Sequence, residues 1–316
     1  MSNVSSSCQG AESVDVAVSA STSGIQAPSK DLRIAVVYIT DGNADDCRRM
    51  AWSMRTLSDR SRMQFDSFIL TPPRTTLPRE VTTVSPLSKH GLVRQLDDME
   101  GVLSTVSISP AGWNRSWSFV VLYRLGLPMH DAFREYDRVL YLDTDTLVLS
   151  DRIDLFLAAD LDGYEVGGVV DTVQEMHNRI HRVVHDDLRP DFSFKMRAIY
   201  GDELELKPYV NAGVLLWNLS AIRADMPWYI ERLRMFWEAE CRGLVGFLDQ
   251  DFVNVMMRVK TGFSMVYNWF TDGDAEAEQC VVRHYCGPQR RFMAAKVAEL
   301  GLCDSQSQAA FITRQV

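Results

Sequence analysis

DRVLYLDTDTLVL, at residues 137–149, is a long apolar run interrupted by two aspartates. A continuous apolar run is typical of a strand covered on both faces, as in a parallel sheet flanked by helices. Asp143 and Asp145 stand two residues apart where this strand ends, so both carboxylates point to the same side. Open α/β sheets bind their ligands at the carboxyl ends of strands. The run therefore predicts an α/β fold with a polar site at one edge of the sheet.

Strand and helix patterns alternate on either side of this run, as a parallel sheet requires. Before it, we predict a helix from Cys47 to Leu57, whose apolar residues recur every three or four positions, and a second helix over residues 117–127 that Pro128 ends. We also predict strands at RIAVVYI (33–39), FDSFIL (65–70) and VTTVSPL (81–87). After it, we predict strands at GYEVGGVVDTV (163–173) and YVNAGVLLWNL (209–219), and a helix at residues 228–240. Residues 172–207 exceed the length of a simple connection, so they are a candidate substrate lid or acceptor subsite.

The composition allows one large core and excludes several classes of function. A chain of 316 residues, 46% hydrophobic and 24% charged, fits a single enlarged domain, which we place at residues 31–295 between a disordered leader (1–30) and a C-terminal tail (296–316). A net charge of −9 argues against a nucleic-acid or anionic-membrane surface, which needs clustered Lys and Arg. No apolar run reaches the roughly 20 residues of a membrane span, and six cysteines without a CxxC pair indicate reduced thiols. We therefore expect a cytoplasmic protein with no integral membrane segment.

The aspartate pair itself indicates a metal site. Two unpaired carboxylates so close together repel one another, and a divalent cation with oxygen ligands removes that cost. The alternative is that Asp143, Thr144 and Asp145 only cap a turn, because such residues are common in loops. The pair alone does not separate these two interpretations.

Two more clusters suggest a ligand beside the pair. In NAGVLL (211–216), Asn211 precedes two small residues at the start of an apolar strand, so backbone and amide can approach a ligand closely; a β-bulge or a tight turn is the alternative. In LDQDFVN (248–254), Asp249, Gln250 and Asp251 stand together before a helix. An acidic N-cap is the alternative, but capping needs one aspartate and this cluster exceeds that need.

A histidine follows a late apolar run. His284 lies in VVRHYCGPQRR (281–291), near Cys280 and Cys286. A lone histidine is more often a satisfied core or surface residue than a ligand. A zinc site made with the two cysteines is another alternative, but no fourth ligand is spaced to complete a closed tetrahedral site.

Taken in order from Ile34 to Phe292, these motifs resemble the retaining glycosyltransferases of family eight, which include glycogenin, bacterial lipopolysaccharide galactosyltransferases and plant galactinol synthases. The resemblance implies a GT-A fold, with a Rossmann-like, mixed and mostly parallel sheet flanked by helices in a single domain. It also implies a UDP-sugar donor, a DxD motif that binds Mn²⁺ with Mg²⁺ as a substitute, and retaining transfer of a hexose or pentose to a hydroxyl acceptor.

The resemblance assigns roles to residues by their position in the family's motifs. The metal ligands would be Asp143, Asp145 and His284. The residues around the reacting sugar would be Asn211, Asp249, Gln250 and Asp171. The remaining donor contacts would be Thr40, Asp41, Asn43, Arg124, Thr144, Asp145, Ala212, Gly213, Asp251, Gly287 and Arg290. Arg290 stands where the family has a phosphate-contacting lysine, and an arginine can bind a diphosphate bidentately.

Several interpretations stay open at this point. Retention would proceed either through attack by Gln250 or with the acceptor entering from the leaving-group face. The chain would otherwise be a glycogenin-like self-glucosylating primer, an inactive nucleotide-sugar binding protein, or a sugar nucleotidyltransferase. The last would be expected to carry a basic glycine-rich phosphate loop, and TDGNADD (40–46) is acidic. The sequence leaves the sugar and the acceptor open and is compatible with a homodimer.

Overall fold

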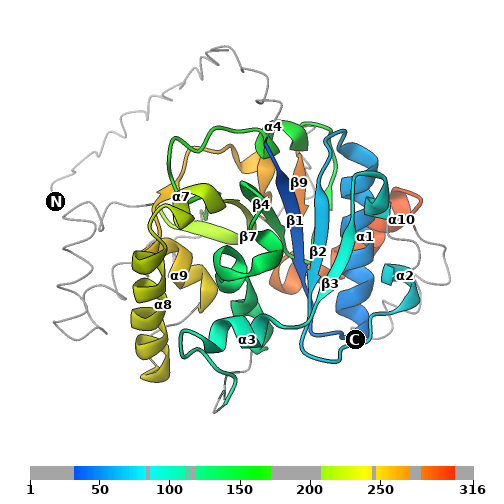
Figure 1. The fold of residues 1–316 in the computed structure, drawn as a ribbon. Helices are drawn as coiled ribbons and strands as arrows, with labels where there is room; N and C mark the ends of the chain where they lie inside the picture. The colour runs from blue at the N-terminus through cyan, green and yellow to red at the C-terminus, as the bar shows by residue number, and fades with distance from the viewer. Residues whose placement is uncertain are drawn as a thin grey trace, which may run out of the picture.

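The computed structural model describes residues 32–82, 86–111, 113, 115, 118–171, 208–243, 247–270 and 279–302, which are arranged around one central sheet (Figure 1). Its seven strands are β1 (Ile34–Ile39), β2 (Asp66–Leu70), β3 (Val93–Leu96), β4 (Arg138–Leu142), β6 (Val166–Val170), β7 (Val210–Asn218) and β8 (Val259–Lys260). They lie in the order β3-β2-β1-β4-β7-β6-β8. In this sheet β7 pairs antiparallel with β4 and β6, and the other neighbours are parallel. The predicted mixed, mostly parallel sheet is confirmed.

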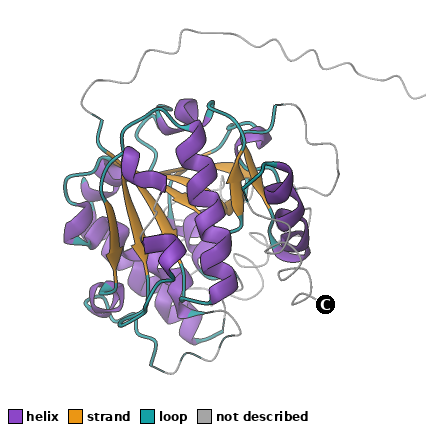
Figure 2. Ribbon diagram, turned by 90° about the vertical axis from the view of Figure 1, so that its right-hand side faces the viewer, coloured by secondary structure: helices purple, strands orange, loops and turns teal. Residues whose placement is uncertain are grey.

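Helices cover both faces of the sheet, as the two orthogonal views show (Figures 1 and 2). On one face lie α1 (Ala44–Arg60) and α4 (Ile153–Leu157). The other face carries α3 (Met99–Ser104), the 3-10 helices η2 (Phe119–Met129) and η3 (Asp131–Phe133), α7 (Leu219–Arg223), α8 (Met226–Cys241) and α9 (Asp249–Met256). The short elements α2 (Arg79–Thr82), η1 (Pro86–Lys89) and η5 (Met265–Tyr267) lie in connections. A second sheet pairs β5 (Thr146–Val148) antiparallel with β9 (Val282–His284), and η6 (Gly287–Gln289) and α10 (Arg290–Glu299) follow it.

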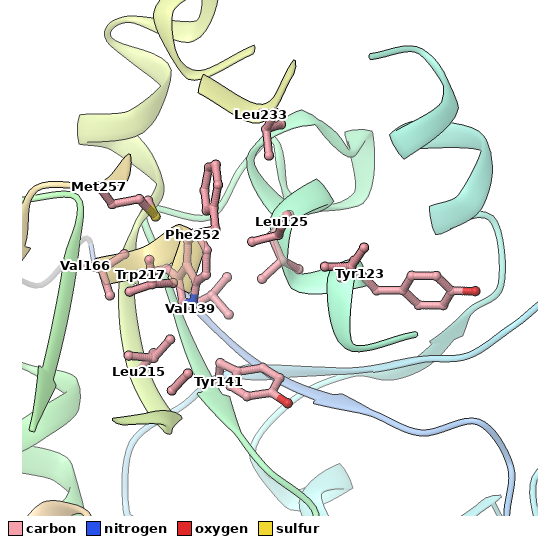
Figure 3. Packing of buried hydrophobic residues seen from close by; sticks show 14 of the residues in the cluster. Tyr123, Leu125, Val139, Tyr141, Val166, Leu215, Trp217, Leu233, Phe252 and Met257 are labelled. Atoms are coloured by element: carbon pink, nitrogen blue, oxygen red, sulfur yellow. The ribbon is translucent and has the colours of Figure 1, made fainter. Parts of the chain in front are cut away.

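The alternation of side chains explains why the central strands are apolar throughout. In β1, Ile34, Val36 and Tyr38 pack on the α1 face, and the intervening residues pack on the opposite face. All six residues of the strand are buried. Burying one such side chain stabilises the fold by roughly 1.5 to 3 kcal/mol. Figure 3 shows the opposite face, where Trp217 of β7 lies beside Phe252 of α9.

A buried ion pair joins α8 to the sheet. Arg232 donates from Nη1 to Glu165 Oε2 at 2.8 Å and from Nη2 to Oε1 at 2.5 Å. The backbone N–H of Arg258 also donates to Glu165 Oε2, at 2.8 Å. Both side chains are almost fully buried, so each charge depends on the other for its solvation.

Three sequence-based assignments differ from the structure. The stretch VTTVSPL is not the third strand, because α2 and η1 occupy it on either side of residues 83–85; the third strand is β3, a half-exposed edge strand whose pattern is weakly apolar. The run 137–149 divides between two sheets: β4 ends at Leu142, where the aspartates begin as predicted, but the apolar residues after them form β5, which belongs to the second sheet.

The third difference is at Pro128, which lies inside η2 instead of ending a helix before it. In a 3-10 helix the N–H of residue 128 would bond to the carbonyl of Leu125, and proline has no N–H. The phenol of Tyr229 donates to this Leu125 oxygen at 2.8 Å. A hydroxyl from α8 thus supplies the hydrogen bond that the proline cannot make.

The candidate lid (172–207), the leader (1–30) and most of the tail lie outside the described residues. None of the described helices combines the length and apolar character needed to cross a bilayer. Within the described ranges, Cys47, Cys241 and Cys286 are free thiols.

Candidate active site

Three potential metal ligands converge at the carboxyl end of β4. Asp143 and Asp145 lie in the turn between β4 and β5, and His284 ends β9, where it pairs with Thr146 of β5. His284 Nε2 lies 3.3 Å from Asp145 Oδ1 and 3.6 Å from Asp143 Oδ2. One ligand atom from each residue lies within 4.8 Å of the others. The structure therefore brings together the pair and the histidine, which are about 140 residues apart in the chain.

The donor atoms of this cluster fit a divalent cation. Asp145 Oδ1 and His284 Nε2 are buried and have no hydrogen-bond partner. Neighbouring ligands of an octahedral ion with bonds of about 2.1 Å stand about 3 Å apart, close to the spacing seen here. Two carboxylates and one imidazole form the cluster, and neither Cys280 nor Cys286 is a member, so among the described residues the zinc alternative with cysteines receives no support.

The bulge in β7 shapes one wall of this cluster. The pairing of β6 with β7 is regular from Val166 to Gly168 and then shifts, so that Val170 pairs with Val210. The extra residues of β7 contain Asn211, Ala212 and Gly213, so the β-bulge named as the alternative is present, and it is formed by the same residues that we predicted to contact a ligand. A Cβ on Gly213 would lie 2.1 Å from His284 Cε1, so this position needs glycine for the imidazole to fit. The Gly213 carbonyl also accepts from the Asp143 N–H at 2.8 Å.

Arg124 of η2 connects the candidate metal site, formed by Asp143, Asp145 and His284 and called the metal cluster below, to α9. Its Nη1 donates to the Ala212 carbonyl at 2.7 Å, and its Nη2 lies 3.5 Å from Asp143 Oδ1. Its Nε is 3.0 Å from Asp249 Oδ2 and makes no hydrogen bond, so this contact is an ion pair. The guanidinium stacks on the ring of Tyr141 at 3.8 Å. The residue was predicted to approach the donor sugar, and the structure places it between the two acidic clusters.

The start of α9 is held against the β7 bulge. Gln250 Oε1 accepts from the Ala212 N–H at 2.9 Å, which directs this side chain toward the bulge. Asp251 accepts from the Tyr209 hydroxyl at 2.6 Å and from the Phe247 N–H at 2.8 Å. Both oxygens of Asp251 are therefore used inside the protein. Of the three polar residues, Asp249 and Gln250 contact the other predicted site residues directly.

The backbone before α9 is strained. Leu248 has a φ of 50° and a ψ of −119°, which a branched side chain rarely adopts. Its side chain is 2% exposed and so is anchored in the core. Such strain persists only where the surrounding packing determines it, and it is common at functional sites. Here it sets the direction in which Asp249 and Gln250 leave the loop.

Three of the predicted donor contacts, Thr40, Asp41 and Asn43, lie just before α1. Asn43 caps α1, since its Oδ1 accepts from the N–H groups of Asp45 and Asp46. The Asp41 side chain is exposed and accepts from the Asn43 N–H at 2.9 Å. Thr40 is buried and accepts from the Gly42 N–H at 3.1 Å. The loop is therefore ordered by its own hydrogen bonds.

The DxD turn is tied to both neighbouring layers. Thr144 Oγ1 donates to Asp46 Oδ1 on α1. On the other side, the Tyr285 N–H donates to the Asp145 carbonyl at 2.8 Å. Arg290 Nε donates to Asp145 Oδ2 at 2.6 Å, and half of the Arg290 side chain is exposed. Gly287 begins the turn before Arg290 with a φ of 59°, a conformation that favours glycine.

The charges of the site are strongly coupled. Burial raises the pKa of Asp145, but His284 and Arg290 outweigh this effect and hold it below its usual range. Burial lowers the pKa of His284, and the Asp145 and Asp143 carboxylates more than compensate, so it is raised overall. Burial raises the pKa of Asp249 to about 6 despite the opposing charge of Arg124. The cluster thus attracts positive charge, whether a proton or a cation.

Three residues that contact the predicted site residues were not predicted from the sequence. Tyr141 donates to Asp143 Oδ1 at 2.5 Å, and burial raises its pKa well above the usual range, so it remains a donor. Asp46 bonds to Thr144, and Asn268 Oδ1 lies 3.0 Å from His284 Nδ1. Tyr141 alternates with the aspartates along the strand, which is a usable signal. Asn268 has no such signal, because a single asparagine in a loop is common.

The remaining predicted residue, Asp171, lies at the end of β6. It is buried, and its Oδ2 accepts from Asn211 Nδ2 at 3.3 Å. It therefore belongs to the group of polar side chains around the β7 bulge, although it does not join the metal cluster.

Comparisons with known proteins identify the family and agree with the fold. Residues 32–290 match the family model described as Glycosyl transferase family 8. The galactosyltransferase LgtC, crystallised with donor and acceptor sugar analogues, superposes with a TM-score of 0.55 and 20% identity, over 80% of this chain and 87% of LgtC. The bifunctional glycosyltransferase WbbM gives a TM-score of 0.62 at 18% identity, over 92% of this chain but 53% of the WbbM chain.

Further similarity extends to GlyE of Streptococcus pneumoniae TIGR4, a glycosyltransferase that gives a TM-score of 0.54 at 18% identity, over 90% of this chain and 64% of that one. A comparison with curated protein sequences gave no match. At these identities the structural likeness establishes the GT-A fold, and the family model establishes the family.

Proposed function

Since the chain belongs to glycosyltransferase family 8 and is a glycosyltransferase enzyme, we propose that it transfers a hexose or pentose from a UDP-sugar to a hydroxyl acceptor with retention of configuration. The observation that carries the proposal is the convergence of Asp143, Asp145 and His284 beside the β7 bulge. The nucleotidyltransferase alternative is set aside by the family assignment.

The three converging residues would hold a divalent cation, and we propose Mn²⁺, with Mg²⁺ as a substitute, because an oxygen and imidazole ligand set suits it. Such a cation, when bound, neutralises the charge that develops on a departing diphosphate. Arg290 supports this assignment, since its half-exposed guanidinium is already fixed beside Asp145 and can donate to phosphate oxygens.

We assign the donor sugar to the space between the β7 bulge and the start of α9. Arg124 holds Asp249 and the Ala212 carbonyl in fixed positions, so carboxylate, amide and backbone groups converge there. Preorganised polar groups of this kind stabilise a sugar that becomes positively charged as its bond to the leaving group breaks. Asn211 and Asp171, linked by a hydrogen bond, would face the same space.

The position of Gln250 supports one route to retention. Its Oε1 accepts from the Ala212 N–H at 2.9 Å, and attack by this oxygen would weaken that hydrogen bond. An acceptor hydroxyl that enters from the leaving-group face needs no such change. We therefore propose the second route, with Gln250 orienting the sugar instead of bonding to it.

The function is tested with a panel of UDP-sugars in the presence and absence of Mn²⁺, scored by UDP release. We expect turnover with at least one donor, and Asp143→Ala should abolish it and weaken UDP binding. Asp151→Ala, at an exposed carboxylate whose partner is Arg62, is the matched control and should behave as the wild type. If no donor turns over and Asp143→Ala leaves UDP binding unchanged, the proposal is wrong.

Intact-mass measurement after incubation with UDP-glucose and Mn²⁺ distinguishes transfer to another molecule from self-glucosylation of the glycogenin kind. A mass increase of the protein by whole hexose units would identify self-glucosylation. The cytoplasmic location, the absence of an integral membrane segment and a homodimer stay predictions from the sequence.

A further inference from the structure

A line of polar side chains connects β6 to the metal cluster through the interior. Asp171 Oδ2 accepts from Asn211 Nδ2 at 3.3 Å, and Asn211 Oδ1 accepts from Asn268 Nδ2 at 3.0 Å. Asn268 Oδ1 in turn lies 3.0 Å from His284 Nδ1. All four side chains are buried, and Asn268 is completely so. Buried amides of this kind specify the donor and the acceptor in each hydrogen bond, because an amide oxygen accepts and an amide nitrogen donates.

The direction of this line is fixed by two groups that cannot reverse. At one end the Asp171 carboxylate accepts, so Asn211 presents its nitrogen there. The backbone N–H of Gly213 donates to Asn211 at 2.9 Å, so the Asn211 oxygen lies on that side. Asn268 must then direct its nitrogen at this oxygen and its own oxygen at His284. It follows that His284 Nδ1 donates, and that a neutral imidazole leaves the lone pair on Nε2.

We propose that Asn268 is a positioning residue that fixes the tautomer and ring orientation of His284 for binding a divalent cation. Nε2 is the nitrogen that faces Asp143 and Asp145, so only the tautomer with the proton on Nδ1 offers a lone pair to a cation there. Without an acceptor opposite Nδ1, the two carboxylates draw the proton to Nε2, and the site loses its nitrogen ligand. The inference rests on the proposed metal site.

The backbone keeps the two residues in register. The Trp269 N–H donates to the Val282 carbonyl at 2.9 Å, and the His284 N–H donates to the Trp269 carbonyl at the same distance. Asn268 therefore lies beside His284 through main-chain hydrogen bonds, independently of its side chain. A substitution of the side chain can consequently remove the acceptor without releasing the loop.

Two substitutions at Asn268 separate positioning from packing. Asn268→Leu keeps four side-chain heavy atoms branched at Cγ and removes the acceptor. Asn268→Asp removes the donor to Asn211 but keeps an oxygen opposite His284 Nδ1. Loss of such a partner lowers metal affinity by about 10- to 100-fold in metalloproteins. We expect this loss in Asn268→Leu, and Asn268→Asp should bind Mn²⁺ at least about tenfold more tightly than Asn268→Leu.

Mn²⁺ binding is measured on each protein by electron paramagnetic resonance of the free ion. The tautomer is read from ¹⁵N-histidine NMR spectra of the Mg²⁺-loaded protein, in which the signals of His284 are assigned by comparison with His284→Ala. The proposal predicts an Nδ1-protonated ring in the wild type. Equal Mn²⁺ affinities of the two variants, or an Nε2-protonated ring, would overturn it. If Asn268→Leu does not fold, the wild-type spectrum still decides the tautomer.

The same measurements distinguish failure of the inference from failure of the proposed function. If the wild type binds neither Mn²⁺ nor Mg²⁺, the metal site is wrong, and the tautomer in the metal-free protein at alkaline pH still tests the hydrogen-bond direction. If the wild type binds Mn²⁺ and both variants bind it equally well, the metal site stands and the role of Asn268 is refuted.

Discussion

Gly213→Ala adds a single methyl group at the point where the structure has no room for it. The new Cβ would lie 2.1 Å from His284 Cε1 and 2.7 Å from both ring nitrogens. Carbon atoms in contact are separated by about 3.5 Å, so the ring must recede by about 1.4 Å or the strand must shift by a comparable amount. The imidazole is 3% exposed, so it has little free space to enter.

The displacement is large compared with the tolerance of a metal site. Metal–ligand distances vary by about 0.2 Å between sites, so a shift several times larger removes His284 from the coordination sphere. Losing the tautomer partner alone costs about 10- to 100-fold in metal affinity, and losing the ligand should cost at least as much. Overpacking of a core typically destabilises by about 1 to 3 kcal/mol, and we expect Gly213→Ala within that range.

The matched control is Gly168→Ala on β6. The three heavy atoms nearest to its Cβ would belong to the aliphatic side chains of Leu215 and Val210, at 3.1 to 3.2 Å. It tests mild overpacking of the same sheet without touching His284. Free energies of unfolding come from urea titration, and Mn²⁺ affinities from calorimetry. Gly168→Ala should change stability but leave Mn²⁺ affinity within about threefold, because its neighbours are not ligands.

The double variant Gly213→Ala/His284→Ala tests the cause directly. If the clash is with the ring, removing the ring should relieve most of the destabilisation, and the two changes should be strongly non-additive. Additive free energies would place the strain elsewhere in the strand. A Gly213→Ala protein with wild-type Mn²⁺ affinity would refute the reasoning altogether.

Three further predictions concern charges. Burial raises the pKa of Asp249 to about 6, so the contribution of this group to the stability of the wild type is complete below about pH 4 and is lost as the pH rises through 6. The free energy of unfolding of Asp249→Asn, relative to that of the wild type, should therefore rise by about 3 kcal/mol between about pH 4 and pH 7. A difference that does not change with pH in urea titrations would contradict this. Glu165→Gln removes the negative charge opposite the buried Arg232 guanidinium and should destabilise by about 3 kcal/mol in the same assay. Arg290→Lys restores the residue type implied by the resemblance and should retain calorimetric UDP binding within about tenfold, whereas Arg290→Ala should lose more, because it also removes the charge beside Asp145.

The parts of the fold that the sequence predicts are those whose signal is local. The apolar run of β1 and the Asp143 to Asp145 turn were identified because both faces of the strand are buried and the polar residues begin where it ends. The metal cluster required a further step, since nothing local connects His284 to the aspartates. The order of motifs along the chain supplied that connection, and the geometry confirms that the three residues meet.

The parts that the sequence does not predict depend on partners distant in the chain. Tyr229 supplies the hydrogen bond that Pro128 lacks, which no local rule for proline anticipates. The strain at Leu248 is set by the packing around it. Asn268 acquires its importance only from the two side chains on either side of it. In each case the residue type is ordinary, and its surroundings determine its role.

Gly213 shows how the metal cluster depends on β7, the antiparallel strand of the main sheet. Its carbonyl accepts from the Asp143 N–H, its own N–H donates to Asn211, and its missing side chain admits the His284 ring. One backbone position therefore sets the aspartate turn, the direction of the amide line and the place of the His284 ring. The contact between Gln250 and Ala212 joins the same bulge from the α9 side. Gly213 contacts both Asp143 and His284 and is bonded to Ala212, so changes at Gly213 should impair cation binding and sugar transfer together. Gln250 contacts the bulge at Ala212, so changes at Gln250 should impair transfer and leave cation binding intact.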